Sequence, residues 1–212
     1  LTDPTDETAA FSSGEDPWYD AAQVTVSAGT INVSSATAVP SQNIAVNLAN
    51  QPFGGFIADV KGEPITVARI GFNVTLGSEG ANDDVDDLTS ISLVDENGAV
   101  VAGPVDGTAA DSANTTGSGD GSVVFTDTVT FPTGMHTFTL KGKVGTDIDN
   151  NVTIQASTTP SGDFATVKGL VTGNTISPTP TSAISFSTMT VKTGALTVSV
   201  SSVPIAQTVI AG

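Results

Sequence analysis

The sequence predicts an all-β protein, an antiparallel β-sandwich of the Ig-like or jelly-roll type with extended terminal segments. Three observations lead to this prediction. Apolar and polar residues alternate with period two through much of the chain from Gln23 onward. Turn-forming residues recur too often for a long helix, with 22 Gly and 11 Pro among 212 residues. Short alternating strands at intervals of about a dozen residues are typical of a sandwich.

The first 22 residues differ from the rest of the chain. Residues 1–22 hold six acidic residues and no base, without a period of either strand or helix. A run of this composition is typical of an extended, solvated tail or linker. Trp18 and Tyr19, the only Trp and Tyr of the protein, stand together near its end. They could hold this tail against the first strand or against a neighbouring subunit.

The period-two signal changes phase once near its beginning. Apolar residues alternate with polar ones on both sides of Ala28-Gly29, but their parity changes across this pair. A glycine at such a point predicts a bulge or a positive φ. We expect the same at Gly194, which occupies the equivalent place in a later copy of the pattern.

Three further stretches carry clear local signals. The longest clean strand is predicted over residues 64–77, PITVARIGFNVTLG. Its inward face holds Ala68, Ile70, Phe72, Val74 and Leu76. The sequence DENG at 95–98 predicts a turn. Pro132-Thr133-Gly134 predicts a hairpin in which Phe131 faces Phe138.

The domain pattern follows from these elements. We expect one sandwich over residues 23–193, with its longest insertion a loop at 107–122. Residues 194–212 form a separate segment that repeats the start of the domain, because the motif T-V-x-x-G-x-[I/L]-x-V-S recurs 165 residues apart, from Gly29 to Gly194. This spacing has the size of a domain and exceeds that of a solenoid repeat.

The strongly negative charge of the chain limits which partners it can bind. The chain carries 22 acidic residues against 6 Lys and Arg, for a net charge of -16. We therefore expect no nucleic-acid partner and an affinity for cations. The sequence has no apolar run long enough to span a bilayer, so we also expect no insertion into a membrane. The chain has no Cys, so it has neither disulfides nor thiol chemistry.

The densest acidic cluster is NDDVDD at 82–87. Its carboxylates are candidate metal ligands, since Ca²⁺ takes six to eight oxygen ligands: Asp83, Asp84, Asp86 and Asp87. The spacing is not that of an EF-hand, and a solvated loop or an Asp-capped turn explains the cluster equally well. Residues 95–97 and 147–151 are weaker candidates, and distant loops could converge on one ion.

The sequence gives no support for catalysis. His136 is the only histidine, and we expect it to point to solvent or to pack on a strand edge. Without Cys, a nucleophile would be a Ser or Thr with no recognisable base. A glycosidase with paired carboxylates remains formally open, although one Trp and one Tyr offer little for stacking sugars. The prediction is that the chain is not an enzyme and has no catalytic residue.

The repeated motif, together with ISLVDENGAVV and FPTGMHTFTLKGKV, resembles the Ig-like modules of bacterial and archaeal surface, S-layer-type and extracellular filament proteins. The resemblance covers roughly residues 23–212. It implies an exported structural or adhesive module at the cell surface, often bound to cations and assembled into arrays.

From this resemblance we expect a structural subunit or module of an extracellular filament or layer. It would assemble from copies of itself by β-strand complementation or by tandem stacking. The alternative is an adhesin or carbohydrate-binding module that uses the loops at 82–87 and 107–122.

Apolar residues near the chain ends are the candidate interface between subunits or modules: Leu196, Val198, Val200, Val203, Val209, Ile210, Trp18 and Tyr19. The C-terminal run could instead pair within its own domain. Four N-x-S/T sites are candidates for glycosylation: Asn32, Asn73, Asn114 and Asn151.

Overall fold

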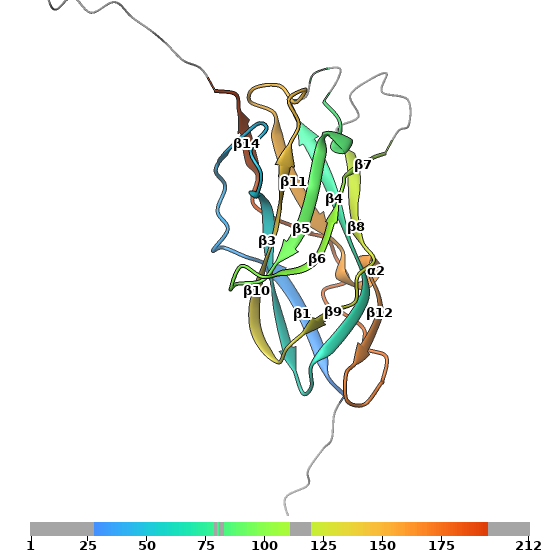
Figure 1. The fold of residues 1–212 in the computed structure, drawn as a ribbon. Helices are drawn as coiled ribbons and strands as arrows, with labels where there is room; N and C mark the ends of the chain where they lie inside the picture. The colour runs from blue at the N-terminus through green and yellow to red at the C-terminus, as the bar shows by residue number, and fades with distance from the viewer. Residues whose placement is uncertain (1–27, 79, 81–82, 111–119, 195–212) are drawn as a thin grey trace, which may run out of the picture.

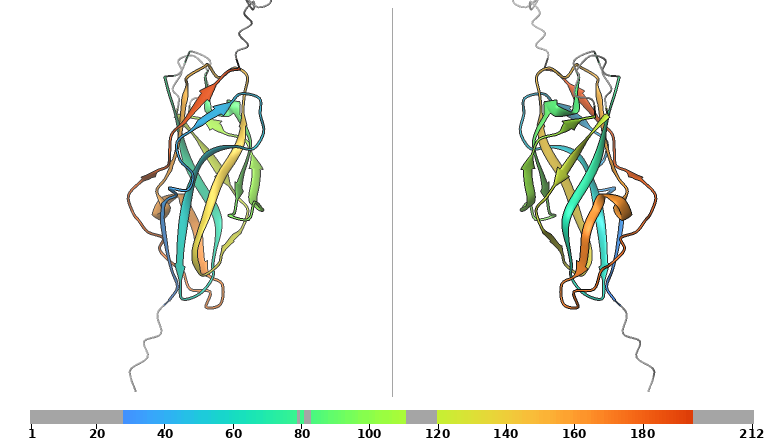
Figure 2. Two further views of the ribbon diagram at one scale, coloured as in Figure 1. Left: turned by 90° about the vertical axis from the view of Figure 1, so that its left-hand side faces the viewer. Right: turned by 90° about the vertical axis from the view of Figure 1, so that its right-hand side faces the viewer.

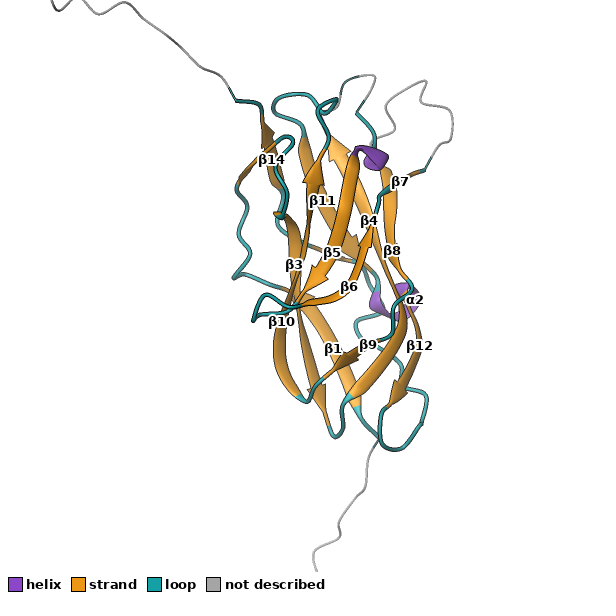
Figure 3. Cartoon of the chain, viewed as in Figure 1, coloured by secondary structure: helices purple, strands orange, loops and turns teal. Residues whose placement is uncertain are grey.

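The computed structural model describes residues 28–78, 80, 83–110 and 120–194. These residues form two β-sheets packed face to face, which confirms the predicted all-β sandwich (Figures 1 and 2). Two short helical turns interrupt the strands, η1 (Val85–Asp87) and α2 (Pro160–Asp163) (Figure 3). No helix within the described residues is long and apolar enough to cross a membrane.

The first sheet has five strands, and each pairs antiparallel with its neighbour. Its order is β1 (Thr30–Ser35), β3 (Gln51–Lys61), β10 (Gly134–Val144), β5 (Leu88–Val94) and β6 (Val100–Val105). Strands that are distant in sequence therefore lie side by side, as β3 and β10 do in the centre of this sheet.

The second sheet is built around one long strand. Its main order is β2 (Asn43–Ala45), β14 (Met189–Lys192), β11 (Thr153–Thr158), β4 (Ile65–Gly77), β8 (Asp120–Phe125) and β7 (Thr108–Ala109). Three shorter strands complete it: β9 (Val129–Phe131) and β12 (Phe164–Gly169) pair with β4, and β13 (Ile184–Ser185) pairs with β11. All described pairs are antiparallel except β14 with β2, which run parallel.

The strand β4 is the longest of the described strands, as the sequence predicted. Four of its five predicted inward residues are buried, but Ala68 is only half-buried. The buried positions change parity between Val67 and Ile70. At the same place the pairing register shifts by one residue, from Ile65 opposite Phe131 to Ile70 opposite Phe125. The change of partner from β9 to β8 therefore rotates Ala68 out of the core.

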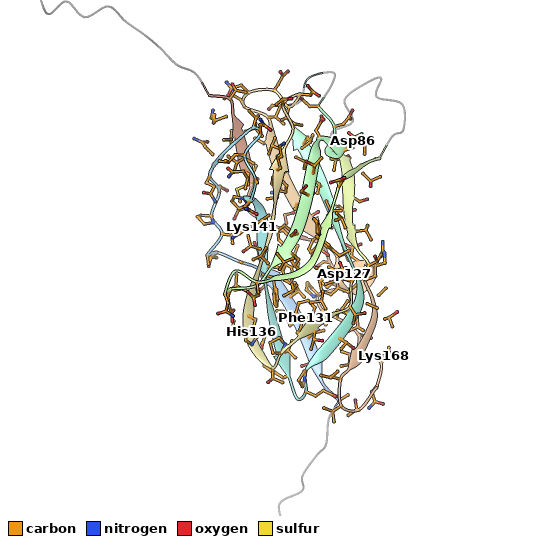
Figure 4. The ribbon with its side chains drawn as sticks, viewed as in Figure 1. Asp86, Asp127, Phe131, His136, Lys141 and Lys168 are labelled. Carbon is orange, nitrogen blue, oxygen red and sulfur yellow. The ribbon has the colours of Figure 1, made fainter. Side chains whose placement is uncertain are left out.

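Between the sheets, phenylalanine rings fill the centre of the core. Phe56 is fully buried and its ring is surrounded by five others at centroid distances of 5.4–6.3 Å: Phe72, Phe131, Phe138, Phe164 and Phe186. Figure 4 shows Phe131 within this interior. Rings at such distances gain from edge-to-face and offset contacts beyond the area that they bury.

The predicted hairpin across Pro132-Thr133-Gly134 is wrong. The strand β9 pairs with β4 in the second sheet, while β10 pairs with β3 and β5 in the first. Phe131 and Phe138 do face each other, with ring centroids 4.9 Å apart, but they meet across the core. Two strands with inward apolar residues show the same sequence pattern whether they pair in one sheet or lie in opposite sheets.

The predicted bulge or positive φ is wrong at Gly29; Gly194 has no positive φ either, and the residues that follow it lie outside the described part of the chain. Gly29 directly precedes β1, whose pairing with β3 shows no bulge. A positive φ of 87° occurs instead at Gly62, where an added Cβ would lie 3.2 Å from the Cα of Gly29. Glycine at position 29 is therefore explained by close packing: a Cβ there would lie 3.0 Å from the Cγ of Glu63.

At its C-terminal side, the described chain ends in a strand of its own domain. Met189 and Val191 of β14 are fully buried in the core. All eight residues predicted at an interface lie outside the described part of the chain, and so does the second copy of the repeated pattern beyond Gly194. The prediction of self-association therefore stays a prediction. The labels of β1 and β14 lie toward opposite ends of the sandwich (Figure 1).

Candidate functional site

The four predicted metal ligands lie at one end of the sandwich, on η1 and just before it; Figure 4 labels Asp86 there. Val85 anchors this turn because its side chain is fully buried. Glycines make room for it. An added Cβ at Gly107 would collide with the backbone carbonyl of Val85, and one at Gly121 would lie 2.6 Å from the Cβ of Val85.

A second acidic connection meets the first at this end. The side chain of Asp83 is almost completely buried, with 1% of the residue exposed. Its Oδ1 accepts a hydrogen bond from the amide of Asp149 at 2.8 Å, and its Oδ2 accepts one from the amide of Gly80. The bond to Asp149 joins positions 66 residues apart. The structure thus brings the 147–151 stretch, a weaker candidate in the sequence, to the main cluster.

The electrostatics of this end are unfavourable to negative charge. Burial raises the pKa of Asp87, and the neighbouring charges of Asp86, Asp147 and Asp84 raise it further. The amide of Asp84 acts in the opposite direction, since it donates a long hydrogen bond of 3.4 Å to Oδ2 of Asp87. Carboxylates from two connections therefore repel one another at the position of Asp87.

These carboxylates do not form an assembled metal centre. In the part of the chain that the structure describes, no three acidic or histidine residues are placed so that they could hold a metal ion. Asp86 is exposed at the outer surface (Figure 4). Asp83 and Asp87 accept bonds from backbone amides, and Asp84 is buried. The four predicted ligands are thus neighbours in space whose oxygens do not converge on one point.

A second polar feature was not predicted from the sequence. A groove of about 530 Å³ lies on the outer face of the first sheet, between the 95–98 turn and the loop at 38–39. Its floor is formed by β10, with Thr137, Thr139 and Lys141. The turn itself forms as predicted: Gly98 has a φ of 85°, and Oδ1 of Asp95 accepts bonds from the amides of Asn97 and Ala99.

At the edge of this groove, His136 bonds to Glu96. Its Nδ1 lies 2.8 Å from Oε1 of Glu96, and its Nε2 lies 3.1 Å from the carbonyl oxygen of Thr133. Both ring nitrogens face oxygen acceptors, an arrangement that needs a proton on each and so favours the imidazolium. The other carboxylate oxygen of Glu96 accepts from the amide of Thr137 at 3.0 Å. No local pattern of residues pointed to this pair, whose members are 40 residues apart.

We expect the His136–Glu96 pair to make stability depend on pH near neutrality. The Glu96 carboxylate, followed by the Thr133 carbonyl, raises the pKa of His136 above its ordinary value of 6.5. The stabilisation is therefore complete below 6.5 and is lost as the pH rises through the raised value. Thermal melts of the parent and of Glu96→Gln across this range should differ most on the acidic side. Equal differences at every pH would contradict the prediction.

The same pair argues against a catalytic histidine. The only histidine of the chain has both ring nitrogens engaged, by Glu96 and by Thr133. A general base must instead present a free ring nitrogen to the proton that it removes. In this arrangement neither ring nitrogen of His136 is free to accept a proton.

Three of the four predicted glycosylation sites are described by the structure. Asn32, Asn73 and Asn151 are all exposed. The side-chain oxygen of Asn32 accepts a hydrogen bond from the Thr179 hydroxyl, and that of Asn151 accepts one from the Lys192 ammonium. Asn114 lies outside the described residues. The structure leaves three asparagines accessible, and their modification stays a prediction.

Comparison with protein-family models and with curated protein sequences returns no match. Among solved structures, the chain is similar to that of AvmM, which is described as catalysing macrocyclization in alchivemycin A biosynthesis. The similarity has a TM-score of 0.35 at 10% sequence identity, and it covers 81% of this chain and 92% of that chain.

This finding corrects three predictions. AvmM is an enzyme, whereas the sequence predicted a structural subunit or module of an extracellular filament or layer that is not an enzyme. The comparison contradicts the filament function with its adhesin alternative, the exclusion of enzymatic activity, and the description as a structural filament protein, and these three predictions are set aside. At this TM-score the likeness transfers no reaction to the chain.

Proposed function

We propose that the acidic end of the sandwich binds a hard divalent cation with the chemistry of Ca²⁺, and that the bound ion stabilises the folded module. The observation that carries the proposal is the meeting of two acidic connections. The segment at 83–87 and the segment at 147–149 are joined by the bond between Asp83 and Asp149. Neighbouring carboxylates repel the negative charge of Asp87, and a bound cation would offset this repulsion.

The chemistry of the ligands favours Ca²⁺. It is bound by carboxylate and carbonyl oxygens, six to eight of them, at about 2.3–2.6 Å in flexible geometry. Beyond the effect of burial, the charges of Asp86, Asp147 and Asp84 all raise the pKa of Asp87, so a cation bound at this end would relieve the repulsion among these carboxylates. The net charge of -16 adds a long-range attraction for any cation.

The proposal keeps the predicted location outside the cell. Calcium sites of extracellular modules bind with dissociation constants of about 10⁻⁴–10⁻³ M. We expect an affinity in this weak range, because the carboxylates do not converge on one point before the ion binds. The exposed N-x-S/T asparagines are compatible with such a location. Loss of binding would remove the proposed function whatever the location.

Added Ca²⁺ should raise the melting temperature of protein that has first been dialysed against a chelator. A ligand that binds only the folded state, present at a concentration of about 100 times its dissociation constant, adds about 2.7 kcal/mol to the free energy of unfolding. Mg²⁺ should have a weaker effect, because it requires near-octahedral geometry and dehydrates reluctantly. Melting curves that coincide with and without Ca²⁺, together with no heat in a calorimetric titration, would remove the proposal.

A pair of variants makes this test specific. Asp87→Asn should raise stability in chelator, because it removes a charge that the fold disfavours, and it should reduce the gain from Ca²⁺. Asp59→Asn removes the same charge in β3, where the half-buried Asp59 forms an ion pair with the exposed Lys61 at 3.1 Å. In this control variant, added Ca²⁺ should raise the melting temperature as much as it does in the parent. An equal loss in both variants would indicate a general charge effect.

A further inference from the structure

Two exposed aliphatic side chains stand next to each other at the end of the sandwich opposite η1. Leu170 is 55% exposed and Val171 is 79% exposed, in the loop that follows β12. Figure 4 labels the neighbouring Lys168 at this end and Asp86 at the other. Single exposed apolar residues are common, but an adjacent pair at the tip of an ordered loop suggests a surface that is covered by something.

The loop holds these two side chains in a fixed position. The amide of Leu170 donates to the Pro64 carbonyl at 2.8 Å. The amides of Val171 and Thr172 donate to Oε2 of Glu63 at 2.8 and 2.9 Å. The Thr172 hydroxyl donates to Oε1 of Glu63 at 2.6 Å and, as the largest cause, holds the pKa of this carboxyl below its ordinary value. The tip is therefore preorganised for contact.

The Glu63 side chain also lies beside the start of the described chain, at Gly29. Gly29 packs against the Glu63 side chain, since an added Cβ on Gly29 would lie 3.0 Å from the Cγ of Glu63. Residues 1–27 therefore join the described structure directly beside the tip. Two of the six basic residues of the protein flank it: Lys168 precedes the loop in β12, and Lys61 ends β3. Lys168 forms no salt bridge within the described part of the chain.

We propose that residues 15–20 of the same chain, Glu-Asp-Pro-Trp-Tyr-Asp, dock on this tip. Trp18 and Tyr19 would cover Leu170 and Val171, and the acidic residues on either side of them would face Lys168. Aromatic side chains gain most from such contacts because they bury a large area with few rotatable bonds.

The reach of the chain allows this contact. Asp20 and Gly29 are nine positions apart, and an extended chain spans at most about 3.3–3.6 Å per residue, or roughly 30 Å over this distance. The complementary signs of charge favour this segment over an apolar one. This proposal is independent of cation binding at the opposite end.

Trp18 offers a direct measurement, because it is the only tryptophan. In the intact protein its emission should be shifted to shorter wavelength and protected from acrylamide, compared with the urea-unfolded chain. The double variant Leu170→Ser/Val171→Ser should lose both effects while keeping the parent's melting temperature. The control Leu48→Ser changes an aliphatic residue that is 54% exposed in a different loop, and it should leave the emission of Trp18 unchanged.

Three results would overturn the proposal. Trp18 could be as accessible in the folded parent as in the unfolded chain. Its protection could survive in the double variant. Its protection could also fall on dilution, which would assign the contact to a second copy of the chain. Protection that is independent of concentration, lost in the double variant and weakened in Lys168→Gln supports docking within one chain.

Discussion

Phe56→Ala should lower the free energy of unfolding by about 3–5 kcal/mol, the range for removing a buried aromatic ring. Phe56 is fully buried and its ring contacts five others from both sheets, so the cavity would open at the centre of the core. The surrounding rings are held by strands of different sheets and cannot all close on the space. For a domain of this size, the melting temperature should fall by roughly 6–20 °C.

Val100→Ala is the matched control for this prediction. Val100 is among the exposed large hydrophobic residues, in the edge strand β6. Removing its methyl groups should change the free energy of unfolding by no more than about 0.5 kcal/mol. Urea titration of both variants measures the two values. A loss for Phe56→Ala that is no larger than that for Val100→Ala would show that the cluster of rings does not organise the core.

Gly107→Ala should be the second most harmful of these changes, through a clash with the main chain. The added Cβ would meet the backbone carbonyl of Val85, which no rotamer change can relieve. The amide of Gly107 also donates to the Leu88 carbonyl at 2.8 Å, so this segment is held on both sides. Such overpacking costs about 1–3 kcal/mol. The turn η1 must shift, and Asp87 with it, so the gain from Ca²⁺ should also fall.

Gly162→Ala separates this clash from the general effect of replacing glycine. An added Cβ at Gly162 meets no atom within 4 Å, and the residue does not have a positive φ. Its replacement should be neutral or stabilise by about 0.4–1 kcal/mol, by reducing the freedom of the unfolded chain. If Gly107→Ala were equally harmless in thermal melts and in Ca²⁺ titrations, the account of how η1 is positioned would be wrong.

Local chemistry in the sequence determined the strands and several of their turns. Alternating apolar residues produced β4, because successive side chains of a strand point to opposite faces. The DENG turn forms as predicted: Asp95 accepts from two amides in it, and Gly98 takes the positive φ. The density of acidic residues at 82–87 is likewise visible in the sequence alone. Each of these features depends on residues within a few positions of one another.

Only the tertiary structure decided which strands and loops meet. Period two shows that Phe131 and Phe138 both face inward, but it does not distinguish pairing in one sheet from packing across two. The sequence attributed Gly29 to backbone conformation, whereas the structure attributes it to the side chain of Glu63. The contacts of Asp83 with Asp149 and of Glu96 with His136 join residues 66 and 40 positions apart. Such contacts depend on how two sheets pack as a whole, and no local pattern of residues encodes that packing.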